Sequence, residues 1–188
     1  MNQGDSYELN FTLPQGPTGP AGPTTIRNAY VAKFNDGMPT NGITVLENGR
    51  LPIDREEANV TNLITLDTAN ETIKFNEPGL YKITFTVCAY ISTTNQAFNP
   101  DTDFISIGFR KVNSDSIFIG ASQYNTNEIS SLLVGQGILS IADTTDLYEL
   151  VNLSKQSIYL RTAKLENINS DSYFASPLLT IVIEYLGK

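Results

Sequence analysis

The sequence has 188 residues, of which 40% are hydrophobic and 17% are charged. This length suits one domain with a short tail, and the composition is typical of a globular protein. The chain has no histidine and one cysteine, Cys88, which excludes Ser-His-Asp and Cys-His catalytic sites, an intrachain disulfide and multi-cysteine zinc sites. The net charge of −8 argues against nucleic acid as a partner.

The N-terminal segment, residues 1–15, has neither the basic nor the apolar stretch of a secretory signal peptide. No apolar run in the chain approaches the roughly 18 residues of a membrane helix, so we expect no membrane insertion. Tyr7, Leu9, Phe11 and Leu13 alternate with polar residues. This period suits a leader that becomes ordered as an added strand on a partner's sheet, although a disordered tail is equally compatible with it.

Residues 16–24 consist of three Gly-X-Y triplets with proline at every X position. Collagen requires glycine at every third position because only glycine fits at the crowded axis of three wound chains. Because glycine occupies every third position in all three triplets, a collagen-like stub of roughly 28 Å is favoured over a simple Pro/Gly linker. Thr18 and Thr24 are candidate O-glycosylation sites, since an extended chain exposes their hydroxyls. The glycines of the triplets are Gly16, Gly19 and Gly22.

The rest of the chain, residues 25–188, is predicted to form strands. Residues 81–89 alternate apolar side chains at odd positions with polar ones at even positions, which indicates a half-buried strand. Residues 113–115 predict a hairpin between the strands that flank them. The other expected strands are 29–34, 63–67, 72–75, 104–110, 117–120, 131–141, 147–153, 157–163 and 178–186.

Two local features complete the predicted fold. The Asn48-Gly49 pair predicts a hairpin between residues 44–47 and 50–53, because both residues tolerate the positive φ of a type I′ turn. Residues 54–57, Asp-Arg-Glu-Glu, predict a single helical turn. Many short strands with no sustained helical period predict an all-β fold, a two-sheet jelly-roll sandwich.

The last predicted strand is apolar on both faces. Leu179, Ile181, Ile183 and Tyr185 form the face expected to pack on the core. The opposite face is too apolar for a solvated surface, so another subunit or a loop is expected to cover it. Because three collagen-like chains also need a trimerising partner domain, we expect a homotrimer. The candidate interface residues on this second face are Leu178, Val182 and Leu186.

The remaining clusters of polar residues do not predict a catalytic, cofactor-binding or metal site. Residues 101–103, Asp-Thr-Asp, fit a proline-led turn better than a calcium site. Asp143, Asp146 and Glu149 fit a turn and an exposed strand better than an acid–base pair. Residues 135–137, Gly-Gln-Gly, lack the lysine and helix of a phosphate loop. We therefore expect the protein to have no enzymatic activity. We expect Cys88 to be buried and to have a structural role.

Three stretches carry a resemblance to known families. Residues 72–85, with Asn-Glu-Pro-Gly-Leu-Tyr at their centre, resemble the sequence leading into the central strand of complement-type and tumour-necrosis-factor-like jelly-roll heads. Residues 142–150 resemble the following glycine-aspartate turn and strand of that family, with Ala142 in place of glycine. Residues 9–20 are similar to leaders of collagen-like glycoproteins from the exosporium, the outer layer of bacterial spores.

This resemblance implies a homotrimeric structural protein on the spore surface, synthesised in the mother cell without a secretory signal. Residues 1–15 would attach it to other spore-surface proteins, and the head would lie outermost. The resemblance also implies that the head could adhere to a host glycan or protein. The presence of only three triplets departs from the long arrays of that family. A phage tail-fibre trimer and a carbohydrate-binding β-sandwich remain alternatives, although the absence of tryptophan disfavours the second.

Overall fold

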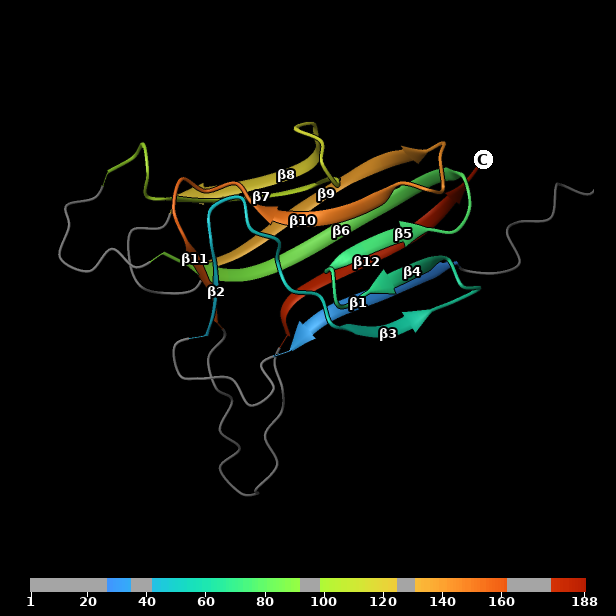
Figure 1. Ribbon diagram of the computed structural model, residues 1–188, viewed down its shortest axis with the longest axis horizontal. Coiled ribbons are helices and arrows are strands. Elements are labelled where there is room, and N and C mark those ends of the chain that lie inside the picture. Colours follow the sequence, from blue (N-terminus) through green and yellow to red (C-terminus); the bar gives the residue numbers. More distant parts are fainter. Residues whose placement is uncertain (1–26, 35–41, 92–98, 125–130, 162–176) are drawn as a thin grey trace, which may run out of the picture.

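The computed structural model describes residues 27–34, 42–91, 99–124, 131–161 and 177–188. Within these residues the chain forms twelve β-strands and no helix (Figure 1). The strands are β1 (Asn28–Phe34), β2 (Ile43–Val45), β3 (Arg55–Asn59), β4 (Ile64–Asp67), β5 (Thr72–Phe75), β6 (Gly79–Tyr90), β7 (Phe104–Lys111), β8 (Ile117–Tyr124), β9 (Ser131–Ile141), β10 (Leu147–Asn152), β11 (Ile158–Leu160) and β12 (Pro177–Gly187).

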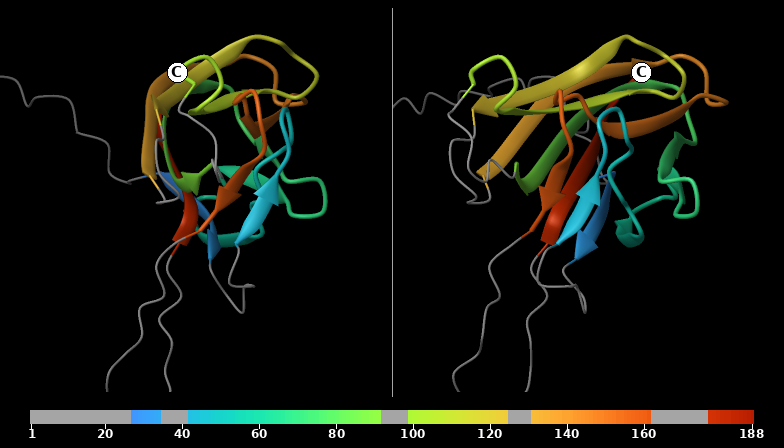
Figure 2. Two further views of the ribbon diagram at one scale, coloured as in Figure 1. Left: turned by 90° about the vertical axis from the view of Figure 1, so that its left-hand side faces the viewer. Right: turned by 60° about the vertical axis from the view of Figure 1, so that its left-hand side comes forward.

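The strands form two antiparallel sheets. The first has seven strands in the order β2-β11-β6-β12-β1-β3, and β9 also pairs with β6. The second has five strands in the order β4-β5-β10-β7-β8. The two sheets form separate layers, and β8 and β9 lie next to each other at one side of the sandwich (Figure 2). The prediction of an all-β, two-sheet sandwich is confirmed.

The central strand β6 shows why this sequence forms a sandwich. Its odd-numbered side chains, from Tyr81 to Ala89, are fully buried, whereas its even-numbered side chains are on the outer face of the seven-stranded sheet. Alternation with a period of two places every second side chain on the same face of a strand. Because β6 pairs with β9 along one edge and with β12 along the other, its inward side chains form the middle of the core.

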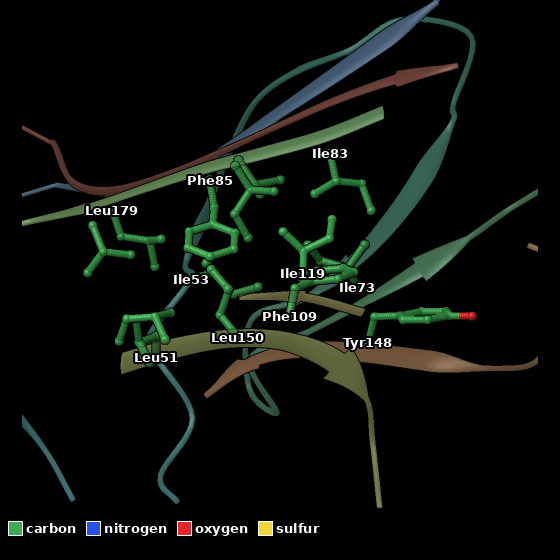
Figure 3. Close-up of a cluster of buried hydrophobic side chains, with 14 of the residues drawn as sticks. Leu51, Ile53, Ile73, Ile83, Phe85, Phe109, Ile119, Tyr148, Leu150 and Leu179 are labelled. Carbon is green, nitrogen blue, oxygen red and sulfur yellow. The ribbon is translucent and has the colours of Figure 1, made fainter. Parts of the chain in front are cut away.

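The core lies between the sheets and is built from both of them. Ile83 and Phe85 of the first sheet point toward Phe109, Tyr148 and Leu150 of the second (Figure 3). The rings of Phe109 and Tyr148 stack with their centroids 5.8 Å apart. Such aromatic contacts add to the stabilisation that comes from burying apolar area. One continuous core therefore holds the two layers together.

The hairpin predicted around Asn48 is wrong, although its turn is present. Asn48 has a φ of 58°, and the Gly49 N–H donates a hydrogen bond of 2.9 Å to the Leu46 carbonyl. The two flanking segments pair with different sheets, because β2 joins β11 while Arg50 bridges to Val151 on β10. The turn thus carries the chain from one layer to the other.

The helical turn predicted for residues 54–57 is also wrong, because this segment begins β3. Arg55 pairs with Ala32, and Glu56 pairs with Val31, at the edge of the seven-stranded sheet. Charged side chains are tolerated on an exposed edge strand, where they discourage pairing with another chain. Backbone pairing with β1 therefore outweighs the helix-capping pattern of the local sequence.

Candidate self-association surface

The outer face of the seven-stranded sheet is the surface on which the sequence placed a subunit contact. In this sheet β9 lies along one edge of β6, and β12 lies along the other (Figure 1). The register sets Thr84 of β6 between Val182 of β12 and Gln136 of β9. Outward side chains from the three strands therefore form continuous rows across the face.

The most exposed apolar side chains of this face are on β9. Leu132, Val134 and Ile138 are 59%, 54% and 67% exposed, and we call these three residues the β9 stripe. The alternating residues Leu133 and Leu139 are buried in the core. β9 is therefore apolar on both faces, a pattern that in sheets accompanies cover on both sides. Sequence analysis missed this stripe, although consecutive apolar residues at 132–134 were a usable signal.

The structure places the three predicted interface residues of β12 in different environments. Leu186 is 52% exposed, and Val182 is half-buried on the outer face, paired with Tyr30 of β1. Leu178 is 1% exposed and belongs to the core. The pairing of β1 with β12 shifts register between Lys33 and Phe34, which disturbs the alternation near the start of β12. Leu178 therefore has no free surface to offer a partner.

Polar side chains on this face are neutralised within the chain. Lys82 Nζ and Glu184 Oε2 are 2.6 Å apart and link β6 to β12. The hydroxyls of Thr86 and Thr180 form a 2.6 Å hydrogen bond across the same pair of strands. Groups that already have partners need less solvation, so they obstruct a dry contact less than unpaired charges would.

Two glycines fix how β9 lies on the sandwich. A Cβ at Gly135 would be 2.1 Å from Phe85 Cζ, and a Cβ at Gly137 would be 2.8 Å from Ile119 Cγ1 on β8. Neither approach is possible for a residue with a side chain. Residues 135–137 thus lie inside a strand, and their glycines let β9 pack closely while its stripe faces outward.

Cys88 lies on the outer face of β6, opposite Leu132 of β9. Its side chain is half-buried, so the predicted burial is only partial. Burial raises the pKa of the Cys88 thiol above its ordinary value, which favours the protonated form at neutral pH. A protonated thiol is a weak nucleophile, so Cys88 contributes packing to this face rather than chemistry.

The acidic residues singled out in the sequence have separate structural partners. Asp103 accepts a 2.7 Å hydrogen bond from the Asn99 N–H and closes the turn before β7. Asp143 accepts hydrogen bonds from the backbone and hydroxyl of Thr145, and these bonds lower its pKa. Asp146 pairs with Lys111 at 2.6 Å. Among the described residues, no group of three or more acidic or cysteine side chains is arranged to hold a metal ion.

Several predicted sites lie outside the described residues and stay predictions. They include the leader at 1–15 and the whole collagen-like stub at 16–24, because the described residues begin at 27. The individual predicted site residues outside the described part of the chain are Gly16, Gly19, Gly22, Thr18 and Thr24.

The described part of the chain contains no helix long and apolar enough to cross a membrane.

Comparisons with known proteins identify the architecture. No family model and no curated protein matches the sequence. The globular domain of zebrafish complement 1qA protein matches with a TM-score of 0.54 and 6% identity, over 87% of this chain and 99% of that chain. The Eiger TNF of S. frugiperda matches with a TM-score of 0.54 and 14% identity, over 87% and 94% of the two chains. The chain therefore has the jelly-roll sandwich fold found in complement C1q and tumour-necrosis-factor domains, as its sequence predicted.

Proposed function

We propose that this chain is a non-enzymatic structural protein of the bacterial spore surface, with a head that self-associates into a homotrimer through the seven-stranded sheet. The observation that carries the proposed self-association is the β9 stripe, which exposes three large apolar side chains on one strand. Isolated apolar side chains are common on protein surfaces, whereas several of them gathered on one face mark an interaction site; here Gln136 alone lies between Val134 and Ile138 on that face.

The energetics of this surface support self-association. Covering the half-exposed β9 stripe contributes a few kcal/mol per copy, at roughly 25 cal/mol for each Å² of apolar area. Association costs about 4–15 kcal/mol in lost translational and rotational freedom. The stripe alone therefore does not suffice, and the contact extends to the exposed Leu80 and Leu186 and to the half-buried Val182.

The arrangement of this face suits a closed ring better than a two-fold dimer. A ring needs two different, complementary surfaces on each copy, whereas a two-fold contact repeats one surface. The β9 stripe lies on one side of β6, and Val182 with Tyr30 lies on the other. The stripe of one copy packs on the β1–β12 side of the next, and three copies then close the ring.

The spore-surface assignment rests on the sequence outside the described residues. Residues 9–20 resemble exosporium leaders, and residues 16–24 supply collagen-like triplets that call for three chains. In this proposal the leader attaches the trimer to other spore-surface proteins, the triplets act as a spacer, and the head faces outward. Labelling intact spores with an antibody against the head tests the location, and a signal confined to the cytoplasm would contradict it.

The oligomeric state is tested by light scattering on the full chain and two matched variants. Ile138 and Leu46 are both 67% exposed, but Leu46 belongs to a turn away from the β9 stripe. We expect wild type and Leu46→Asp to have three times the monomer mass, and Ile138→Asp to be a folded monomer. A monomeric wild type at micromolar concentration, or a trimeric Ile138→Asp, would overturn the proposed assembly.

A further inference from the structure

A small polar pocket lies on the outer face of the five-stranded sheet, on the opposite layer from the β9 stripe. It has a volume of about 290 Å³, near the lower end of the range for small-molecule sites. Its floor comes from β7 and β10, and its walls come from the turns at residues 46–49 and 111–114. We call it the turn pocket, and the residues used below are Asn48, Arg50, Arg110, Asn113, Asp115 and Glu149.

An ion triad around the buried carboxylate of Glu149 forms the floor of the turn pocket. Glu149 is 2% exposed, and its Oε1 accepts a hydrogen bond of 2.8 Å from Arg110 Nε. Its Oε2 accepts a hydrogen bond from Arg50 Nε. One carboxylate between two guanidinium groups leaves a net positive charge in the triad, which the Asp115 carboxylate in the lining offsets over the pocket as a whole. Because both oxygens of Glu149 are occupied, the carboxylate holds the arginines in place and is not itself presented to a ligand.

The two arginines differ in the donors that they leave available. Arg50 Nη1 donates a hydrogen bond of 3.0 Å to the Asn70 carbonyl. Arg110 lines the pocket, and within the described residues the hydrogen bonds of its side chain use Nε alone, which leaves the two Nη groups as donors for a ligand. The Arg110 side chain is only 18% exposed, which limits competition from bulk water. A fixed guanidinium fork matches the two oxygens of a carboxylate.

The walls add hydrogen-bonding groups on rigid turns. Asn48 and Asn113 have φ angles of 58° and 61°, and each lies in a turn closed by a backbone hydrogen bond. Asp115 also lines the pocket, and a carboxylate can accept hydrogen bonds from ligand hydroxyls. Amides and a carboxylate are suited to hydroxyl groups, which both donate and accept. The described lining residues include no aromatic ring, so a sugar in this pocket would be held by hydrogen bonds and charge without an aromatic platform.

We propose that the turn pocket binds a single sugar acid, with its carboxylate on the Nη fork of Arg110 and its hydroxyls on Asn48, Asn113 and Asp115. The Nε contacts to Glu149 explain how the 46–49 turn is tied to β7 and β10. These Nε contacts do not explain why Arg110, held in place by Glu149, also lines an open polar pocket. This inference is independent of the trimer, because it concerns the other sheet.

The test is a titration of the full chain with glucuronate, followed by amide chemical shifts in NMR spectra. We expect saturable shifts around Asn113 with a Kd of about 1 mM, a usual strength for one small polar ligand in an open site. Glucose lacks the carboxylate and acetate lacks the hydroxyls, so each binds at least about tenfold more weakly. Equal affinity for acetate would indicate a general anion site, equal affinity for glucose a neutral-sugar site, and either result overturns the proposal, as does an absence of saturable shifts.

Variants test the assigned roles. Arg110→Lys keeps the charge but loses the fork, so we expect glucuronate affinity to fall at least about tenfold. Arg55→Lys, on β3 of the other sheet, is the matched control and leaves affinity unchanged. Asn113→Gly preserves the positive φ while it removes the amide, so it weakens binding without unfolding the turn. Unchanged affinity in both Arg110→Lys and Asn113→Gly would contradict the assignment.

Discussion

The ring of Phe85 on β6 covers Gly135 on β9 so closely that a Cβ at position 135 would lie 2.1 Å from Phe85 Cζ. The two residues are register partners in the seven-stranded sheet. The ring thereby fills the space that a side chain at position 135 would occupy. Phe85 is fully buried, so it has no room to move aside. This contact links the position of β9, and thus of its exposed stripe, to the packing of the core.

The first prediction follows from this contact. Gly135→Ala forces a methyl group into Phe85, and we expect it to lower the free energy of unfolding by about 1–3 kcal/mol. Thermal unfolding measures the change. Gly120→Ala on β8 is the control, because a Cβ there would meet no atom closer than 3.8 Å. Similar unfolding temperatures for the two variants would show that β9 does not pack as described.

The second prediction separates the core from the proposed interface on β12. Leu178 is buried within one chain, so Leu178→Ala leaves a cavity and costs about 2–5 kcal/mol of folding stability. Leu186 is 52% exposed, so Leu186→Ser leaves the fold intact but weakens the trimer. Thermal unfolding and light scattering across a dilution series measure the two effects. A reversed pattern, with Leu178→Ala affecting assembly alone, would restore Leu178 as an interface residue.

The third prediction concerns alkaline pH. Tyr81 is fully buried, and its hydroxyl donates a 2.7 Å hydrogen bond to the Glu77 carbonyl. Burial raises the pKa of Tyr81 above its ordinary value of 10.0. The folded chain therefore keeps this proton where the unfolded chain releases it. The stability that Tyr81 contributes is present below pH 10 and is lost as the pH rises further.

Tyr81→Phe should accordingly reduce stability at pH 7 by about 1 kcal/mol, because the hydrogen bond is removed. At pH 11 the deficit should shrink, since phenylalanine does not ionise. Urea unfolding at the two pH values measures the difference. Tyr124→Phe is the control, because Tyr124 is 62% exposed and should show little change at either pH. A constant deficit for Tyr81→Phe at both pH values would contradict this explanation.

The fourth prediction concerns residues 1–15. Deleting them should leave a head whose particle mass is still three times its monomer mass and whose unfolding temperature equals that of the full chain. The reason is that the described strands begin at residue 28. We expect the shortened protein to be lost from the spore surface, as detected by immunolabelling. Fusing residues 1–15 to an unrelated soluble protein should give that protein at least partial incorporation into the spore surface. Normal coating by the deletion variant would place the anchor in the head.

Strands with a regular pattern were predicted well from the sequence. β5 and β9 have the predicted bounds, and β6 shows the predicted alternation of buried and outward side chains. The hairpin between β7 and β8 is also confirmed. In these segments the hydrophobic period and the tertiary structure favour the same conformation. β3 escaped prediction because its sequence, Arg-Glu-Glu-Ala-Asn, has no apolar face and is a strand only through its pairing with β1.

The candidate sites were harder to predict because they are built from distant segments. The triad of the turn pocket joins Arg50, Arg110 and Glu149, and no local pattern connects them. From the sequence, Glu149 is expected on an exposed strand face. The structure shows that it is 2% exposed, because Arg50 and Arg110 both pair with its carboxylate. Asn152, which begins an Asn-x-Ser sequon, is a second residue whose environment is set by distant segments. Its amide is fully buried and donates to three backbone carbonyls, so the folded head cannot receive a glycan there.

The placement of the turn pocket and the β9 stripe on opposite layers bears on valency. In the proposed trimer, the seven-stranded sheets are covered by neighbouring copies while the five-stranded sheets face outward. Three equivalent pockets are then displayed on one rigid particle. Simultaneous attachment to a surface rich in acidic sugars would strengthen weak single contacts by about 10²–10⁴-fold. Such a head would discriminate by ligand density, adhering to crowded surfaces and ignoring the same sugar free in solution.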